Sequence, residues 1–154
     1  MIVLNLFLLI FAFVCMEGVA WFAHKYVMHG FLWILHRDHH TRDKGGFFQR
    51  NDFFFLLFAA PGILLLYLGV VYQDLTSCLW VGGGITLYGL TYLVVHDLFI
   101  HRRFKFPQRV ENPYLLALRR AHRTHHKHLG KEDGECFGML WVARPFLAES
   151  SNRK

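Results

Sequence analysis

The sequence has 154 residues, of which 54% are hydrophobic and 17% aromatic, which is unusually apolar for a soluble domain of this length. The formal net charge is +6 with the histidines neutral, but the basic residues flank apolar stretches, which argues against binding to nucleic acid. The three cysteines lie far apart and form no CxxC, so neither a disulfide framework nor a thiolate metal site is indicated. We therefore expect one integral membrane domain over residues 1–154.

Three stretches are apolar enough, over about 20 residues, to cross the hydrocarbon core of a membrane. They are Ile2–Ala23, Phe53–Tyr72 and Cys78–Val95. The first contains one acid, Glu17, and lacks a basic n-region and a small-residue cleavage site, so we expect a retained span and not a signal peptide. The apolar stretches Phe31–Leu35 and Tyr114–Leu118 are too short to cross, and we expect them in helices at the membrane interface.

The basic residues indicate how these spans are oriented. Lysine and arginine are absent from the first 24 residues and from the five-residue turn Gln73–Ser77, but they occur throughout the 24–52 loop and the 96–154 tail. The positive-inside rule places that loop and that tail in the cytoplasm. We therefore expect an all-α, multi-pass protein of the inner cell membrane, with three transmembrane helices and a cytoplasmic, histidine-rich helical cap.

All eleven histidines fall into a few tight groups. Two HX4H pairs alternate with two HX2HH triplets, and His128 follows the last triplet. The ten paired or tripled histidines are His24, His29, His36, His39, His40, His96, His101, His122, His125 and His126. Because imidazole is the commonest metal ligand in proteins, ten of them on one side of a membrane predict a site for two metal ions. Imidazole suits zinc, copper, iron and nickel alike, but all-nitrogen coordination in a membrane setting fits redox iron better than a structural zinc, which needs only four ligands.

Helical spacing makes further predictions about these groups. On an α-helix the three histidines of HX2HH share an arc of about 100°, so we expect each triplet to form a three-ligand wall. The two histidines of HX4H lie about 140° apart, so they cannot be side by side, but they could bind one site from its two edges or each reach a different metal. We expect His128 to be an interfacial residue and not a ligand. Asp97, directly after a predicted ligand, is the best candidate to accept a hydrogen bond from a ligating imidazole, and Glu17 is a second candidate.

The motifs resemble those of the membrane fatty-acid hydroxylase superfamily, and most closely those of the β-carotene 3-hydroxylases of bacteria and plants. The matching residues are Met16-Glu17-Gly18 leading to AHKYVMHG, then HRDHH, Asn51-Asp52, VHDLFIHRRF, AHRTHH and GKEDGECFGMLWV. Leu98 stands where these relatives usually have glycine, which bears on substrate fit and not on metal binding. A further upstream span of the plant relatives has no counterpart in this sequence.

The resemblance implies a non-haem diiron monooxygenase in which the ten histidines of the pairs and triplets ligate the iron. The enzyme would insert one atom of O2 at carbon 3 of each β-ionone ring of β-carotene, giving zeaxanthin through cryptoxanthin. The resemblance also implies that electrons come from NAD(P)H through ferredoxin and its reductase. Because the sequence has no Rossmann glycine pattern, we expect an external electron donor.

A basic group could steer an acidic donor or simply anchor the cap at the membrane. It consists of Arg102, Arg103, Lys105, Arg109, Arg119 and Arg120. An oligomer is compatible with the sequence.

Three other functions remain open from the residues alone. The nearest is a hydroxylase or desaturase of a fatty acyl lipid or a sterol, which would use the same ligands. A metal transporter would need polar residues along the spans. A bis-histidine haem protein would need single histidines on facing helices, which adjacent triplets supply poorly.

Overall fold

The computed structural model describes residues 1–41, 48–103 and 110–151, and within these ranges the chain is helical and contains no strand. Three long apolar helical segments are able to cross a membrane, which confirms the predicted number of spans. They are Ile2–Phe31, comprising α1 (Ile2–Phe22) and η1 (Ala23–Phe31); α3 (Asp52–Val71); and Ser77–Ile100, comprising α4 (Ser77–Tyr92) and η3 (Leu93–Ile100). The first and third segments therefore run beyond the predicted ends; the first contains His24 and His29, and the third contains His96 and ends directly before His101.

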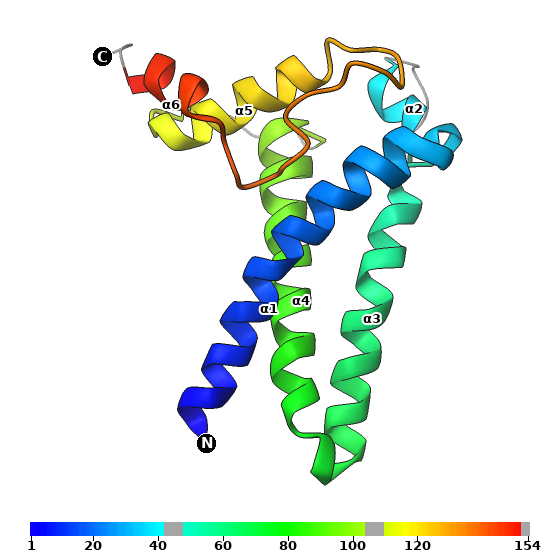
Figure 1. Cartoon of the computed structure of the whole chain (residues 1–154), viewed down its shortest axis with the longest axis vertical. Helices are drawn as coiled ribbons and strands as arrows, with labels where there is room; N and C mark the ends of the chain where they lie inside the picture. Colours follow the sequence, from blue (N-terminus) through cyan, green and yellow to red (C-terminus); the bar gives the residue numbers. More distant parts are fainter. Residues whose placement is uncertain (42–47, 104–109, 152–154) are drawn as a thin grey trace.

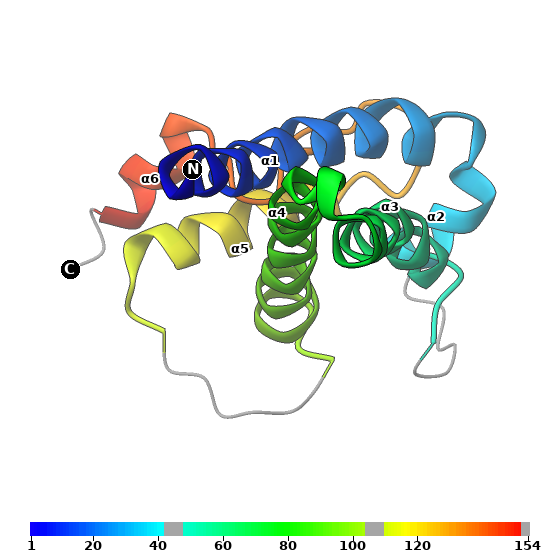
Figure 2. The same ribbon diagram turned by 90° about the horizontal axis from the view of Figure 1, so that it is seen from below.

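The helix α4 packs against both α1 and α3 (Figures 1 and 2). Glycines permit this close packing, as is common where membrane helices meet. A Cβ atom at Gly82 would lie 2.9 Å from the carbonyl oxygen of Gly62 in α3, and one at Gly84 would collide with the carbonyl oxygen of Leu9 in α1. The short η2 (Gln73–Leu75) forms the turn between α3 and α4, at the same end of the bundle as the N-terminus.

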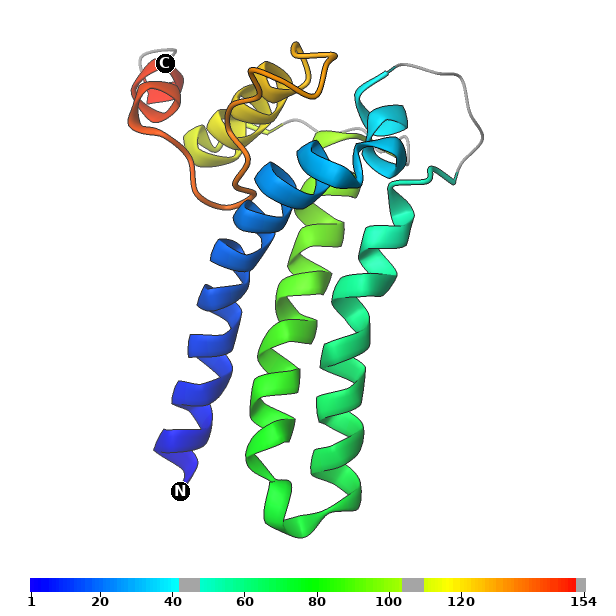
Figure 3. The same cartoon turned by 45° about the vertical axis from the view of Figure 1, so that its right-hand side comes forward.

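The opposite end of the bundle carries the cap, made of α2 (Trp33–His40), α5 (Pro113–His125) and α6 (Arg144–Ser151) (Figures 1 and 3). Helix α5 begins where Pro113 predicts, and the side chain of Asn112 caps it by accepting the backbone N–H groups of Tyr114 and Leu115. The predicted interfacial stretches thus belong, at least in part, to α2 and α5, and the all-α prediction with three spans is confirmed.

Between α5 and α6 the chain contains no helix and turns back toward α1. We call residues 128–141 the strap. Its Met139 is buried against Met16 of α1 and Tyr88 of α4. The strap therefore connects the cap to the membrane-spanning bundle.

Candidate metal centre

The first HX4H pair lies in the π-helix η1, and the second lies at the end of the π-helix η3, with His96 inside it and His101 as its C-cap. Such π-helices are a frequent feature of functional sites. In η1 the backbone N–H of Leu32 donates to the carbonyl of Val27, and at the end of η3 the N–H of His101 donates to that of His96, both five residues back. This hydrogen bonding places residues five apart nearly above one another. The ring centroids of His96 and His101 are accordingly 4.5 Å apart. The expectation that the members of a pair are not side by side was wrong, because it assumed α-helical spacing.

The triplets behave in the opposite way. On α2, His36 and His40 are four residues apart and their Nε2 atoms lie 3.1 Å from each other, whereas His39 turns toward His101, 4.4 Å away between ring centroids. On α5, His125 and His122 likewise point to different groups of histidines. Each triplet thus serves two groups of ligands and is not a single three-ligand wall.

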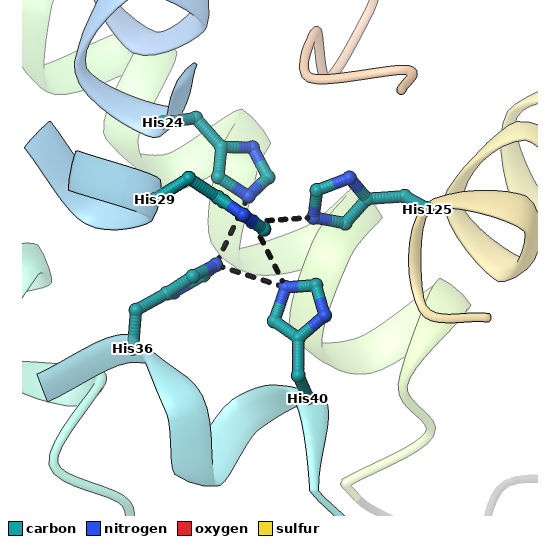
Figure 4. A group of neighbouring side chains, drawn as sticks. All are labelled: His24, His29, His36, His40 and His125. Atoms are coloured by element: carbon teal, nitrogen blue, oxygen red, sulfur yellow. Dashed lines mark hydrogen bonds between the residues drawn. The ribbon is translucent and has the colours of Figure 1, made fainter. Parts of the chain in front are cut away.

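Nine of the ten predicted ligands form two groups, in each of which one ligand atom per residue lies within 4.8 Å of the others. The first cluster contains His24, His29, His36, His40 and His125, and the second contains His39, His96, His101 and His122. The members of the first cluster come from η1, α2 and α5, and their rings point toward a common centre (Figure 4).

Hydrogen bonds determine which ring nitrogen carries the proton in the first cluster. Nδ1 of every member faces an acceptor oxygen, and in four members this is a main-chain carbonyl of the strap. The acceptors are Phe137 O for His24, Lys131 O for His29, His128 O for His40, Glu135 O for His125 and the Asn51 side chain for His36, at 2.6–3.1 Å. A carbonyl oxygen only accepts, so Nδ1 donates and Nε2 keeps its lone pair.

Five Nε2 lone pairs therefore converge with no proton between them. The separations of neighbouring Nε2 atoms are 3.1–3.3 Å. Two nitrogens that each coordinate one ion at about 2.1 Å lie about 3.0–3.3 Å apart when the angle at the ion is roughly 90–105°. The donor set consequently fits a metal cation of the kind that imidazole prefers.

Burial keeps these imidazoles neutral. Desolvation is the main cause that lowers the pKa of His36 and His125 to about 2 and the pKa of His40 to about 4, with neighbouring histidines adding to the effect. Burial likewise lowers the pKa of His39, His101 and His122 in the second cluster. At neutral pH the lone pairs are therefore available to a metal.

Side chains orient two members of the second cluster, His96 and His39. Nδ1 of His96 bonds to the carboxylate of Asp97 at 3.0 Å, and Nδ1 of His39 bonds to Gln49 Oε1 at 3.1 Å. Arg103 joins these partners, because its guanidinium contacts Asp97, Gln49 and Asp52. Nε2 of His39 is buried and has no hydrogen-bond partner within the described residues, as expected for a nitrogen that coordinates a metal.

His126 and His128 lie outside both groups. Nε2 of His126 is 2.8 Å from Nε2 of His122, and its ring stacks on that of His40 at 4.6 Å, so it lies between the two clusters. The side chain of His128 instead faces Glu135, 3.6 Å away. Its carbonyl oxygen, however, orients His40.

The other carboxylates differ in their relation to the histidines. Asp97 contacts a histidine as predicted, whereas Glu17 contacts none and bonds to the strap and to Tyr88. Asn51 and Gln49 were missed as orienting groups, although two polar residues directly before a span are a usable signal. The strap carbonyls were also missed, and no side chain could have indicated them.

A cavity of about 280 Å³ between the spans reaches both clusters. His24 of the first cluster and His96 and His122 of the second line it, and most of its wall is apolar, with Phe58 of α3 and Ile85 of α4 among the lining residues. An apolar cavity that ends at a few polar groups is the usual form of a small-molecule site.

The basic residues proposed for donor docking do not form one exposed surface. Arg103 is engaged with Asp52, and Arg119 is buried with its guanidinium over the ring of Phe99. Arg102 is exposed. Lys105 and Arg109 lie outside the described residues.

Comparison with known proteins agrees with this site. The fatty acid hydroxylase family matches residues 9–143. A β-carotene hydroxylase of Pantoea ananas is 44% identical over 127 residues, and the match covers 82% of this chain and 71% of the relative. A β-carotene hydroxylase of Pseudescherichia vulneris is 39% identical over 141 residues, and that match covers 92% of this chain and 78% of the relative. A chloroplastic β-carotene 3-hydroxylase of Haematococcus lacustris is 39% identical over 129 residues, but the match covers only 39% of that protein. No solved structure matches. The resemblance drawn from the histidine motifs is thereby confirmed, and the chain belongs to the fatty acid hydroxylase family, a family of oxidoreductases.

Proposed function

We propose that this protein is a β-carotene 3-hydroxylase, which hydroxylates carbon 3 of each β-ionone ring and forms zeaxanthin through cryptoxanthin. The apolar cavity that reaches both histidine clusters from within the spans carries the proposal. β-Carotene dissolves only in the bilayer, so a site for it must open among membrane helices. The names of the relatives from Pantoea and Pseudescherichia support the same substrate.

We further propose that the ten histidines bind two iron ions. The first cluster would hold one, and the four histidines of the second cluster together with His126 would hold the other. Bound there, iron would supply the activation of O2, with electrons from NAD(P)H through ferredoxin and its reductase. The convergent lone pairs and the absence of cysteine from both groups support an all-imidazole site.

The protein's own residues would bind the ring and hold the ligands in place. The apolar side chains at Phe58 and Ile85 would exclude water from the ring and leave His24, His96 and His122 as the polar end of the cavity. Asp97 would fix the tautomer of His96 by accepting its Nδ1 proton. The electron donor would approach from the cap, since the apolar spans occupy the other end.

We also propose that residues 1–154 form one domain of the inner membrane, with the cap and the C-terminus in the cytoplasm. The distribution of lysine and arginine supports this orientation. Fluorescent-protein and alkaline phosphatase fusions to the C-terminus and to the Gln73–Leu75 turn test it. Phosphatase activity at the C-terminus would contradict the orientation.

Expression in a bacterium that accumulates β-carotene, followed by pigment analysis under ¹⁸O2, tests the function. We expect cryptoxanthin and zeaxanthin with ¹⁸O in their hydroxyl groups, and none from a His125→Ala variant. If carotene is unchanged while an acyl lipid or sterol is hydroxylated or desaturated, the substrate proposal is wrong. Oxygen-independent uptake of metal into vesicles would point to a transporter instead.

A further inference from the structure

Glu17 joins three parts of the molecule without touching any histidine. Its Oε1 accepts the backbone N–H groups of Met139, Leu140 and Trp141 at 2.8–2.9 Å, and its Oε2 accepts the hydroxyl of Tyr88 at 2.7 Å. All four neighbours are donors, which suits a carboxylate acceptor. One side chain of α1 thereby fastens the end of the strap to α1 and α4.

The same strap carries the main-chain acceptors of the first cluster. Its carbonyls at His128, Lys131, Glu135 and Phe137 accept Nδ1–H from four of the five ligands. In the second cluster, Nδ1 of His96 and Nδ1 of His39 face the side chains of Asp97 and Gln49 instead. Among these hydrogen bonds, those to carbonyls of the strap come from the first cluster.

The backbone of the strap is held in a conformation that it would not adopt by itself. Asp133 and Cys136 have φ values of 60° and 59°, in the left-handed region that non-glycine residues avoid. Such conformations persist where the surroundings fix them. A Cβ atom at Gly138 would lie 3.0 Å from Glu17 Oε1, so the strap also approaches Glu17 more closely than most residues would permit.

We propose that Glu17 is a positioning residue for the first cluster, because it fixes the strap whose carbonyls orient four of that cluster's histidines. The proposal rests on the proposed function only in assuming that the first cluster binds a metal. The second cluster is expected to be independent of Glu17.

Titration of the purified protein with cobalt(II) alone, followed by visible absorption, tests this. We expect two sites in the unsubstituted protein. Glu17→Leu, which has similar volume but no acceptor, should weaken one site by about 10–100-fold, as loss of ligand-orienting groups typically does, and leave the other unchanged. Glu17→Gln retains an acceptor oxygen and should restore most of the affinity. Equal weakening of both sites, or no weakening, would overturn the proposal.

The thiol of Cys136 reports the position of the strap without any metal. With Cys15→Ala and Cys78→Ala in place, it is the only cysteine, and it is partly buried. Its rate of alkylation by a maleimide should rise several-fold in Glu17→Leu and remain near the original rate in Glu17→Gln. An unchanged rate in Glu17→Leu would show that Glu17 does not hold the strap.

A second pair of variants keeps the test decisive if Glu17→Leu does not fold. Gly138→Ala presses a methyl group against Glu17 and Trp141 and should weaken the same single cobalt site. Gly130→Ala, also in the strap, has its nearest neighbour 4.0 Å away and should change nothing. Equal behaviour of the two variants would refute the inference. If the unsubstituted protein does not convert β-carotene, the proposed function is wrong, but the result of the cobalt titration still holds.

Discussion

Gly84→Ala tests whether the contact between α1 and α4 sets the geometry of the metal centre. A Cβ atom at this position would overlap the carbonyl oxygen of Leu9 and lie 2.8 Å from Cβ of Ala12 and 3.1 Å from the backbone nitrogen of Phe13. All three atoms belong to α1 and two are backbone, so no rotamer change relieves the overlap. The helices themselves must move apart.

The size of the effect follows from these distances. Ordinary contacts begin near 3.4 Å, so the approach to Ala12 alone requires a shift of at least about 0.6 Å. Overpacking of this kind costs about 1–3 kcal/mol, which corresponds to a Tm lower by roughly 2–12 °C for a chain of this size. Helix α1 continues into η1, which carries His24, and α4 continues into η3, which carries His96. A shift of this size exceeds the tolerance of about 0.2 Å for metal–ligand distances, so we expect it to disturb the ligands as well.

Gly83→Ala is the matched control, since it makes the same substitution one residue away. Its Cβ atom would lie 3.7 Å from Leu9 Cδ1, an ordinary contact. Thermal unfolding in detergent and the metal content of each purified variant are the measurements. We expect Gly83→Ala to match the unsubstituted protein and Gly84→Ala to lose both stability and metal. Indistinguishable variants would refute the reasoning.

Three further predictions concern the site. His125→Ala should abolish carotene hydroxylation while the protein is still inserted in the membrane, whereas His128→Ala should be mild because the carbonyl that orients His40 remains; severe loss in His128→Ala would make its side chain part of the site. The stability of the metal-free protein should fall as the pH drops from about 6.5 to about 4, because the unfolded chain takes up protons that folded His40, with its lowered pKa, does not; a flat thermal-unfolding profile over this range would contradict it. Gly89→Phe should fill the cavity, which Gly89 lines, and lower kcat/KM at least about tenfold with normal metal content, whereas unchanged kinetics would place the substrate elsewhere.

The spans were predictable because the membrane acts on local composition. A stretch of about 20 apolar residues has few alternatives to a crossing helix. The start of α5 was predictable for a similar reason, because Asn112 and Pro113 act on the backbone beside them. In both cases the residues that cause the structure are neighbours in the sequence.

The division of the histidines into clusters was not predictable by the same means. The spacing of HX4H indicates separated ligands only if the helix is α, and nothing in His24–His29 shows that the backbone turns into a π-helix. That choice depends on long-range contacts, such as the bond from His24 to the carbonyl of Phe137 in the strap. Main-chain acceptors have no side-chain signature, so the orienting role of the strap emerges only in three dimensions.

The strap also determines when the centre is completed during synthesis of the chain. His24 and His29 leave the ribosome well before their orienting carbonyls at Phe137 and Lys131, which follow 113 and 102 residues further along the chain, and before the ligand His125. Since a chain grows at about 5–20 residues per second, the spans have several seconds in which to enter the membrane before the first cluster exists. Metal loading of this cluster is therefore a late event, and a chain truncated before the strap would reach the membrane without a complete site.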